Sequence, residues 1–453
     1  MAAKAEPPTR VLCLIAAEGA PEPHCYLAPH GPALGLPAVS VALPSGLDAG
    51  ADAIARAVRA QYGLAVEFLL AVSRATDDPA APAVVLLVAL PGSRPVAGDL
   101  TLLSLAAARR AAWADPAQRD LLDVLAEPAA PNRVAWARPG FLAEAHAWLT
   151  TQLAAHGLSV TGPLQVRRHW SLSVLLRVPT NGGDVYFKAV PPVFQQEPRL
   201  TQFLALRFPS RVPGVLAIDP ERRWLLMPAF TGDPLQGQAD PAAWLSALRG
   251  YADLQAQLVA DALGLLPLGC PDRRAAVLAG QVDEVLAATD AMRIGLPRGL
   301  TPEQATQVTA LGPALRQACR AFAALPLPPT LEHGDLHGGN IVSAPAGGWL
   351  YYDWTDGCLA PPFFGLPTYL ENAPADLHPA LIEAYAEPWR AFADASTLAE
   401  ARRLARPLSD LHIALSYVWI HAHTEPRQRW QLAGALPYFL RELLRHAPEA
   451  GLA

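Results

Sequence analysis

Apolar and polar positions alternate in short runs through the first 135 residues of the chain. Four apolar runs have the length and composition of β-strands. Around residues 51–61 the apolar positions follow a helical period instead, with Ile54 and Val58 on one face and Gly63 as a C-cap. Residues 102–125 carry further helical patterns. The pattern predicts an α/β domain over residues 1–135, with strands at residues 10–16, 38–43, 66–72 and 84–90.

One amphipathic helix separates this region from the next. Phe141, Trp148 and Leu153 form an apolar stripe at helical spacing, which predicts a linker helix within residues 136–159. Strand-like runs follow, and Asn-Gly-Gly at residues 181–183 is typical of a hairpin turn. The runs predict a small antiparallel sheet over residues 160–232, with strands at residues 166–178, 184–190, 214–219 and 223–227.

Helical periodicity dominates residues 233–453. One short hairpin interrupts it, because two strand-like runs flank a turn that contains proline and glycine. The chain as a whole therefore predicts an α+β fold, with an α/β domain ahead of a small sheet and a large helical region. The elements expected in the last region are helices at residues 244–262, 277–289 and 305–325 and strands at residues 341–343 and 349–352.

Composition then narrows the class of protein. The 453 residues are too many for one ordinary domain, and a hydrophobic content of 52% allows a large core. The net charge is −6 without a basic block, so nothing indicates a nucleic acid partner. Five cysteines without a C-x-x-C motif indicate reduced thiols. The chain shows neither a signal-peptide pattern nor an apolar run of the ~18 residues that cross a membrane, so we expect a cytoplasmic protein.

The segment His333–Asn340 reads H-x-D-x-x-x-x-N, and the predicted hairpin after it ends at Asp353. This arrangement suits phosphoryl transfer from a magnesium nucleotide. Asp335 would accept a proton from the attacking hydroxyl group or orient that group. Because a hairpin returns the chain beside its start, Asp353 should lie next to Asn340, and their oxygens would share one Mg²⁺ ion. The structural alternative is a surface loop with a few polar residues.

The sequence HGDLHGGN followed by DWTD resembles the catalytic loop and metal-binding acid of the aminoglycoside phosphotransferase/choline kinase-like family. The resemblance covers about residues 160–440. It implies a bilobal protein-kinase-like fold, with residues 160–232 as the small lobe and residues 233–453 as the helical lobe. It also implies an enzyme that uses ATP and Mg²⁺ to phosphorylate a hydroxyl group of an aminoglycoside-, amino alcohol- or sugar-like molecule.

The same resemblance implies a nucleotide site around Lys188. This lysine occupies the strand position that holds the α- and β-phosphates in kinase-like proteins, and Glu197 would pair with it. Adenine would bind to backbone groups at the hinge after the last strand, near Met227 and Ala229. A lysine on a strand is otherwise most often solvated, and that is the alternative interpretation of Lys188.

Two features favour a second function, a non-catalytic nucleotide-binding module, although members of the family often lack the first of them too. The glycine loop G-x-G-x-x-G of protein kinases is absent, and Ser171 and Ser173 lie in its place. These serines would contact phosphate or belong to an ordinary turn. Gly365 stands where the family has an aspartate that braces the catalytic loop. Its absence puts the rigidity of the loop in doubt.

The first domain weakly resembles a Nudix domain, through the sequence Leu-Pro-Ser-Gly that ends at Gly46, and through Arg56 and Gly63. A Nudix hydrolase holds Mg²⁺ on glutamates of its helix, so the resemblance implies a degenerate, inactive domain. An unrelated α/β domain is the structural alternative, and an active Nudix hydrolase is a third candidate function. The positions of the family's metal-binding glutamates hold Ala57, Ala60 and Gln61.

Acceptor specificity in the phosphotransferase family comes from helices around the catalytic loop. Acidic residues in that region would attract an acceptor that carries an amine, or would form a solvated helix face. The sequence does not choose the acceptor, and it does not predict the oligomeric state. The acidic residues are Glu371, Asp376, Glu383 and Glu387.

Overall fold

The computed structural model describes residues 8–17, 22–43, 46–74, 82–126 and 130–452. The chain divides into two compact units. The first comprises Met1–Pro191 with Thr424–Gln431, and the second comprises Pro192–His423 with Leu432–Ala453. Both units combine sheets with helices, so the expected α+β class is confirmed at this level.

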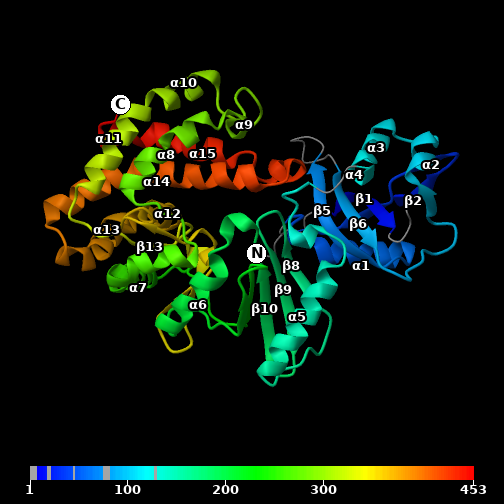
Figure 1. The fold of residues 1–453 in the computed structure, drawn as a ribbon, viewed down its shortest axis with the longest axis horizontal. Coiled ribbons are helices and arrows are strands. Elements are labelled where there is room, and N and C mark those ends of the chain that lie inside the picture. The colour runs from blue at the N-terminus through cyan, green and yellow to red at the C-terminus, as the bar shows by residue number, and fades with distance from the viewer. Residues whose placement is uncertain (1–7, 18–21, 44–45, 75–81, 127–129, 453) are drawn as a thin grey trace. The chain divides into compact units, whose positions relative to one another are not determined.

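A mixed sheet forms the core of the N-terminal region (Figure 1). Its path is β3-β2-β1-β6-β5, while β4 pairs with β1 and β7 pairs with β2. β1 and β6 are parallel, and each contains a continuous, buried apolar run, as expected for strands covered on two faces. The strands described are β1 Thr9–Ala17, β2 His24–His30, β3 Ala33–Gly35, β4 Ala38–Val41, β5 Val66–Arg74, β6 Ala83–Ala89 and β7 Thr101–Ser104.

Helix α1 (Ala51–Tyr62) packs onto this sheet as its periodicity predicts. Ile54 and Val58 are buried, and Gly63 ends the helix in a left-handed conformation with φ of 72°. Of residues 102–125, where helical patterns are expected, the first three belong to strand β7 instead. Short helices follow β7, namely α2 (Leu105–Arg110), α3 (Pro116–Asp120) and α4 (Asp123–Ala126).

The rest of the first unit contains three consecutive antiparallel strands of the second large sheet and a helix that covers them. The strands are β8 (Gln165–His169), β9 (Val174–Thr180) and β10 (Gly183–Ala189), so the expected single strand at residues 166–178 is in fact two. The predicted linker helix is α5 (Phe141–Ala155), after the short η1 (Ala135–Ala137). Its Trp148 packs edge-on against Phe187 of β10 with ring centroids 5.8 Å apart, so α5 is a packed part of this unit.

Residues 424–431 complete the first unit from the far end of the sequence. Glu425 forms a two-pronged ion pair with Arg133, with N–O distances of 2.7 and 3.0 Å. The side chains of Arg133 and Glu425 are 11% and 3% exposed, so the pair is buried. Gln431 accepts hydrogen bonds from the hydroxyl and the backbone N–H of Ser171. No sequence pattern indicated this contribution.

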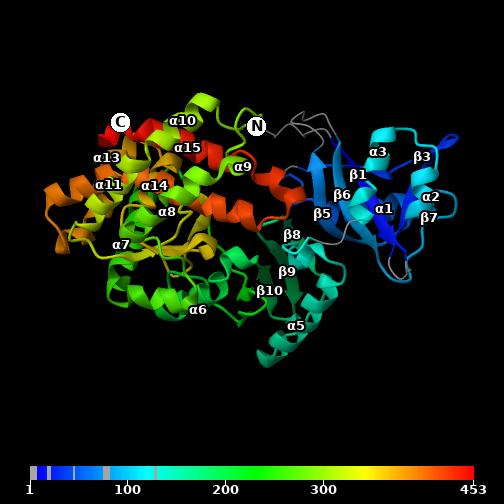
Figure 2. The same ribbon diagram turned by 45° about the horizontal axis from the view of Figure 1, so that its top comes forward.

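The second unit is mainly helical around one large apolar core (Figure 2). The expected helix at residues 305–325 is interrupted at Leu311, and Pro313 stands in the first turn of the new helix. Long α14 lies beside α15. The helices are α6 Glu197–Arg207, α7 Pro241–Leu258, η3 Val259–Leu268, α8 Ala275–Ala287, α9 Thr289–Met292, α10 Pro302–Ala310, α11 Gly312–Ala323, α12 Leu366–Asn372, α13 His378–Ala386, α14 Ala395–His423 and α15 Ala435–His446.

Short strands and single turns position the remaining loops of the second unit. β11 (Ala217–Asp219) and β12 (Trp224–Pro228) form one hairpin, close to the expectation. β13 (Thr330–Glu332) pairs with β16 (Cys358–Ala360), and β14 (Ile341–Ser343) pairs with β15 (Trp349–Tyr351).

The five cysteines are buried free thiols. Among the described helices, none combines the length and apolar character needed to cross a bilayer.

Candidate active site

The H-x-D-x-x-x-x-N segment runs from the end of β13 to the start of β14. In the hairpin register Ile341 faces Tyr351, and the N–H of Tyr352 donates to the carbonyl of Asn340 at 3.1 Å. The residue after Tyr352 is Asp353. The hairpin therefore brings Asn340 and Asp353 to the same end, as the spacing predicts.

Asp335 and Asn340 are in direct contact. The side-chain nitrogen of Asn340 donates to the Asp335 carbonyl at 2.9 Å and to its carboxylate Oδ2 at 3.2 Å. These bonds orient Asn340, and among the described residues none reaches its Oδ1. The Asp335 side chain is 49% exposed, so its carboxylate is accessible to a substrate. The loop thus presents a carboxylate and an amide oxygen together.

Asp353 has a left-handed backbone, with φ of 64° and ψ of 61°. A residue other than glycine held in this region costs about 1–2 kcal/mol, and such strain is found most often at functional sites. The Thr355 hydroxyl donates to Oδ1 of Asp353, and the indole of Trp354 donates to the Tyr351 carbonyl at 3.1 Å. The Thr355 bond orients the carboxylate, and the Trp354 bond fixes the backbone turn that follows it.

Two histidines hold the loop from either side of Asp335. His333 is fully buried, and its Nε2 donates to the Tyr352 carbonyl at 3.0 Å while its Nδ1 accepts from the Asp335 N–H at 3.3 Å. Burial lowers the pKa of His333, which favours the neutral ring. His337 accepts from the Gly339 N–H at Nδ1 and lies 3.5 Å from Asp335 Oδ2. Hydrogen bonding to Asp335 raises the pKa of His337.

The donor set suits magnesium. Asn340 supplies an amide oxygen and Asp353 a carboxylate, and Mg²⁺ takes one or two such ligands and completes its shell with water and phosphate oxygens. Among the described residues, no group of three or more His, Cys, Asp or Glu side chains gathers at metal-binding distance.

The expected adenine segment lies beside the same hairpin. Met227 is half-buried near the end of β12, and Ala229 is exposed just beyond it. The ring of Phe230 packs against Tyr352 with centroids 5.0 Å apart. Residues 233–236 then run along β14, where the Leu235 N–H donates to the Ile341 carbonyl at 2.9 Å. The structure thus brings the expected hinge to the edge of the expected metal site.

Lys188 and Glu197 are both nearly inaccessible to solvent. Lys188 lies in β10 of the first unit and is 8% exposed, so the alternative of a solvated lysine is wrong. Glu197 begins α6 of the second unit and is 2% exposed. Buried charges of this kind require partners. The pairing of the two side chains stays a prediction.

Comparison with known proteins decides the family. Residues 164–404 match the model of the phosphotransferase enzyme family, APH, which is more than half of the chain. The chain belongs to the phosphotransferase enzyme family. The prediction of an enzyme that phosphorylates a hydroxyl group of a small molecule is confirmed. A comparison with curated proteins found no match.

The chain is also similar to solved structures of other proteins. Macrolide 2′-phosphotransferase from Brachybacterium faecium is 21% identical over 64% of this chain and 97% of its own, with a TM-score of 0.44. A choline/ethanolamine kinase family protein from Mesorhizobium loti is 17% identical over 67% and 98%, with a TM-score of 0.42. Choline kinase from Streptococcus pneumoniae is 11% identical over 68% and 99%, with a TM-score of 0.44.

The serines in place of the glycine loop of this phosphotransferase have structural roles. The Ser171 hydroxyl donates to Gln431 at 2.8 Å, and Ser173 Oγ accepts from the Trp170 indole at 2.9 Å. Both serines are buried. The observed bonds support the interpretation of turn serines over that of phosphate ligands.

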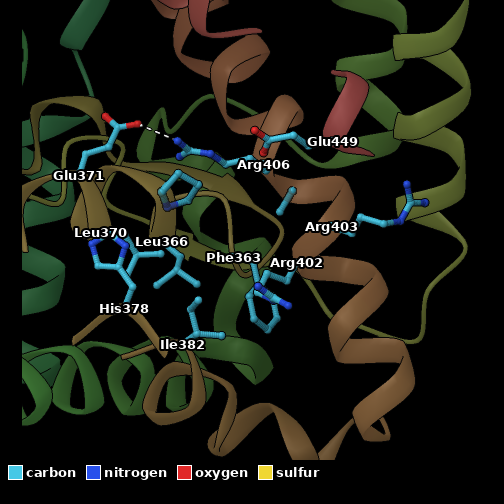
Figure 3. Close-up of a pocket in the computed structure, with 12 residues that line it drawn as sticks. Phe363, Leu366, Leu370, Glu371, His378, Ile382, Arg402, Arg403, Arg406 and Glu449 are labelled. Carbon is cyan, nitrogen blue, oxygen red and sulfur yellow. Dashed lines mark hydrogen bonds and ion pairs between the residues drawn. The ribbon is translucent and has the colours of Figure 1, made fainter. Parts of the chain in front are cut away.

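The acidic residues that suggested an amine-bearing acceptor are mostly paired with arginines. Glu371 accepts from Arg406 at 3.1 Å and lines a cavity of about 390 Å³ together with Arg402 and Arg403 (Figure 3). Asp335, Asn340 and Asp353 are not among the residues that line it. Glu383 pairs with Arg390, Glu387 pairs with Arg249, and Asp376 is exposed. No uncompensated acidic pocket forms from these four residues.

One residue in contact with the catalytic loop was missed by the sequence analysis. Glu332, the last residue of β13, is fully buried, and burial raises its pKa. Its carboxylate accepts hydrogen bonds from the loop and from Gly365. The signals present in the sequence were an acid directly before the H-x-D motif and a glycine at position 365.

Proposed function

We propose that this phosphotransferase moves the γ-phosphoryl group of ATP to a hydroxyl group of a small molecule. The observation that carries the proposal is the cluster of Asp335, Asn340 and Asp353 at one end of the β14–β15 hairpin. The acceptor oxygen forms a bond to phosphorus as the bond between phosphorus and the bridging oxygen of ADP breaks. The acceptor loses one proton, and ADP is the leaving group.

Asp335 is the residue proposed to handle the acceptor. Its half-exposed carboxylate orients the hydroxyl group and takes its proton, while Asn340 and His337 hold that carboxylate in place. Asn340 and Asp353 would hold Mg²⁺, which when bound neutralises charge on the phosphates. The β14–β15 hairpin brings Asp353 back to the end where Asn340 contacts Asp335.

Lys188 and Glu197 are proposed to form the pair that holds the α- and β-phosphates, with adenine at Met227 and Ala229. Burial of both charged side chains and the position of the hinge beside Tyr352 support this assignment. In this interpretation residues 160–232 are the small lobe of a bilobal kinase-like fold, residues 233–453 are the helical lobe, and residues 136–159 join them to the first domain.

The decisive test is ADP release over a panel of amines, amino alcohols, sugars and antibiotics. We expect acceptor-dependent release by the wild type and a fall of ~10²–10⁴-fold in Asp335→Asn, the usual size of a lost acid–base contribution. Thermal stabilisation by Mg-ATP should persist in the variant. Asp376→Asn, at an exposed position, is the matched control. Equal turnover by Asp335→Asn would refute the role of Asp335, and ATP binding without release for any acceptor would favour the non-catalytic module.

We propose that the first domain is an inactive Nudix-like domain. Helix α1 carries one acid, Asp52, and its Oδ2 accepts from the Val166 N–H at 2.8 Å. Gln61 donates to the Ala38 carbonyl at 3.1 Å, and Ala57 and Ala60 offer no oxygen ligand. A nucleoside diphosphate hydrolysis assay on Asp353→Ala tests this. Persisting pyrophosphate cleavage would contradict the proposal.

A further inference from the structure

Glu332 receives hydrogen bonds from three separate segments of the second unit. Oε1 accepts from the Gly334 N–H and from the Tyr251 hydroxyl, each at 3.2 Å. Oε2 accepts from the Gly365 N–H at 3.0 Å and from the Gln255 amide at 3.3 Å. The carboxylate therefore connects the catalytic loop, helix α7 and the turn before α12.

The same donors also fix the chain on either side of Glu332. Gln255 donates to the Leu331 carbonyl at 2.7 Å and to the Tyr251 hydroxyl at 3.1 Å. The backbone N–H of His333 donates to that hydroxyl at 2.9 Å. Buried polar groups that are all satisfied in this way specify one arrangement of the chain. The entry to the loop that carries Asp335 is thus held at consecutive residues.

A side chain at position 365 would occupy the space that the Glu332 carboxylate fills. Gly365 has φ of −83°, a conformation open to any residue, so the backbone does not require glycine here. A Cβ at this position would lie 2.1 Å from Oε1 of Glu332 and 2.8 Å from its Oε2. Only a residue without a side chain leaves room for the buried carboxylate. A side chain at position 365 and the observed position of the Glu332 carboxylate therefore exclude each other.

We propose that Glu332 is a positioning residue, whose carboxylate reaches from β13 into the place that an acid at position 365 would otherwise fill. It holds the loop so that Asp335 faces the acceptor, and this role rests on the proposed phosphotransfer at Asp335. Gly365 is then no sign of a disabled enzyme. The brace of the loop comes from a different point of the chain.

Three variants test whether Glu332 takes the place of an acid at position 365. They are Glu332→Ala, Gly365→Asp and the double variant. Glu332→Ala removes the acceptor of four hydrogen bonds, and Gly365→Asp collides with Glu332. Misplacement of a catalytic group costs up to ~10²-fold in rate, so each single change should lower kcat by ~10–100-fold. In the double variant the introduced aspartate enters the space that Glu332 vacates, and kcat should recover to within about tenfold of the wild type. The KM for ATP should change less than kcat throughout.

Hydrogen exchange separates this inference from the proposed function. The Gly334 N–H should exchange faster in Glu332→Ala without any substrate and slow again in the double variant. Glu332→Gln keeps the size of the side chain and serves as a second test if the other single variants fold poorly. The Gly334 N–H should exchange in it at a rate between those of the wild type and Glu332→Ala. Unchanged exchange in Glu332→Ala and Glu332→Gln, or no recovery in a folded double variant, would overturn the role of Glu332. Altered exchange in a protein that never transfers phosphate would support the brace and count against the proposed function.

Discussion

A close backbone approach at the site gives a sharp prediction, the replacement of Gly334 by alanine. Gly334 has φ of 79°, and a Cβ there would lie 2.6 Å from both the backbone oxygen and the Cβ of Asp356. Gly347, in the turn of the β14–β15 hairpin, has a similar φ of 88° but no atom within 4 Å of a Cβ. Gly347→Ala is therefore a control that carries the backbone strain without the collision.

The two costs can be separated. A left-handed alanine costs about 1–2 kcal/mol, which both variants share. Crowding against fixed atoms adds about 1–3 kcal/mol in Gly334→Ala alone. We expect urea unfolding to show a loss of about 1–2 kcal/mol for Gly347→Ala and about 2–5 kcal/mol for Gly334→Ala.

Activity should separate the variants further. The collision pushes the catalytic loop away from the segment that carries Asp353, so Gly334→Ala should lose most of its acceptor-dependent ADP release. Gly347→Ala should keep it, because the turn lies at the other end of the hairpin. Equal stability losses, or equal activities, would refute the close approach as the reason for glycine at position 334.

Three further outcomes are expected. Asp353→Asn tolerates the left-handed backbone but removes a charged ligand, so the Mg²⁺ concentration for half-maximal activity should rise at least ~10-fold, and an unchanged requirement would exclude Asp353 as a ligand. Glu425→Ala leaves Arg133 buried and unpaired, so urea unfolding should show a loss of about 3–5 kcal/mol, larger than for Arg133→Met with Glu425→Leu. Burial lowers the pKa of His169 from 6.5 to about 4. The stability that neutral His169 gives the folded protein is fully present above pH 6.5 and is lost as the pH falls through 4, a change of about 3 kcal/mol. Measurements of unfolding free energy against pH should show that His169→Gln lacks this change.

The hairpin and the loop were predictable because their determinants are local. The turn at residues 344–348 sets the strand register, and the register alone brings Asn340 beside Asp353. The helix α1 and its cap at Gly63 were predictable for the same reason. In each case the residues that decide the conformation lie within a few positions of one another.

Features that depend on distant partners were not predictable. Residues 102–104 were included in a helical stretch, whereas they form part of strand β7 through pairing with β2, far back in the sequence. The role of Glu332 depends on Gly365, 33 residues away, and no pattern connects them. The serines at positions 171 and 173 likewise owe their buried hydrogen bonds to a partner near the C-terminus and to an indole three residues away.

The contribution of residues 424–431 to the first unit has a consequence for biosynthesis. On the ribosome the N-terminal unit emerges early, but its last piece is translated only after residues 192–423. Arg133 and Glu425 are 292 residues apart, so at the usual ~5–20 residues per second Arg133 waits roughly fifteen to sixty seconds for Glu425. During that interval the nascent unit holds a guanidinium group without its native carboxylate, so newly made chains should be most dependent on chaperones then.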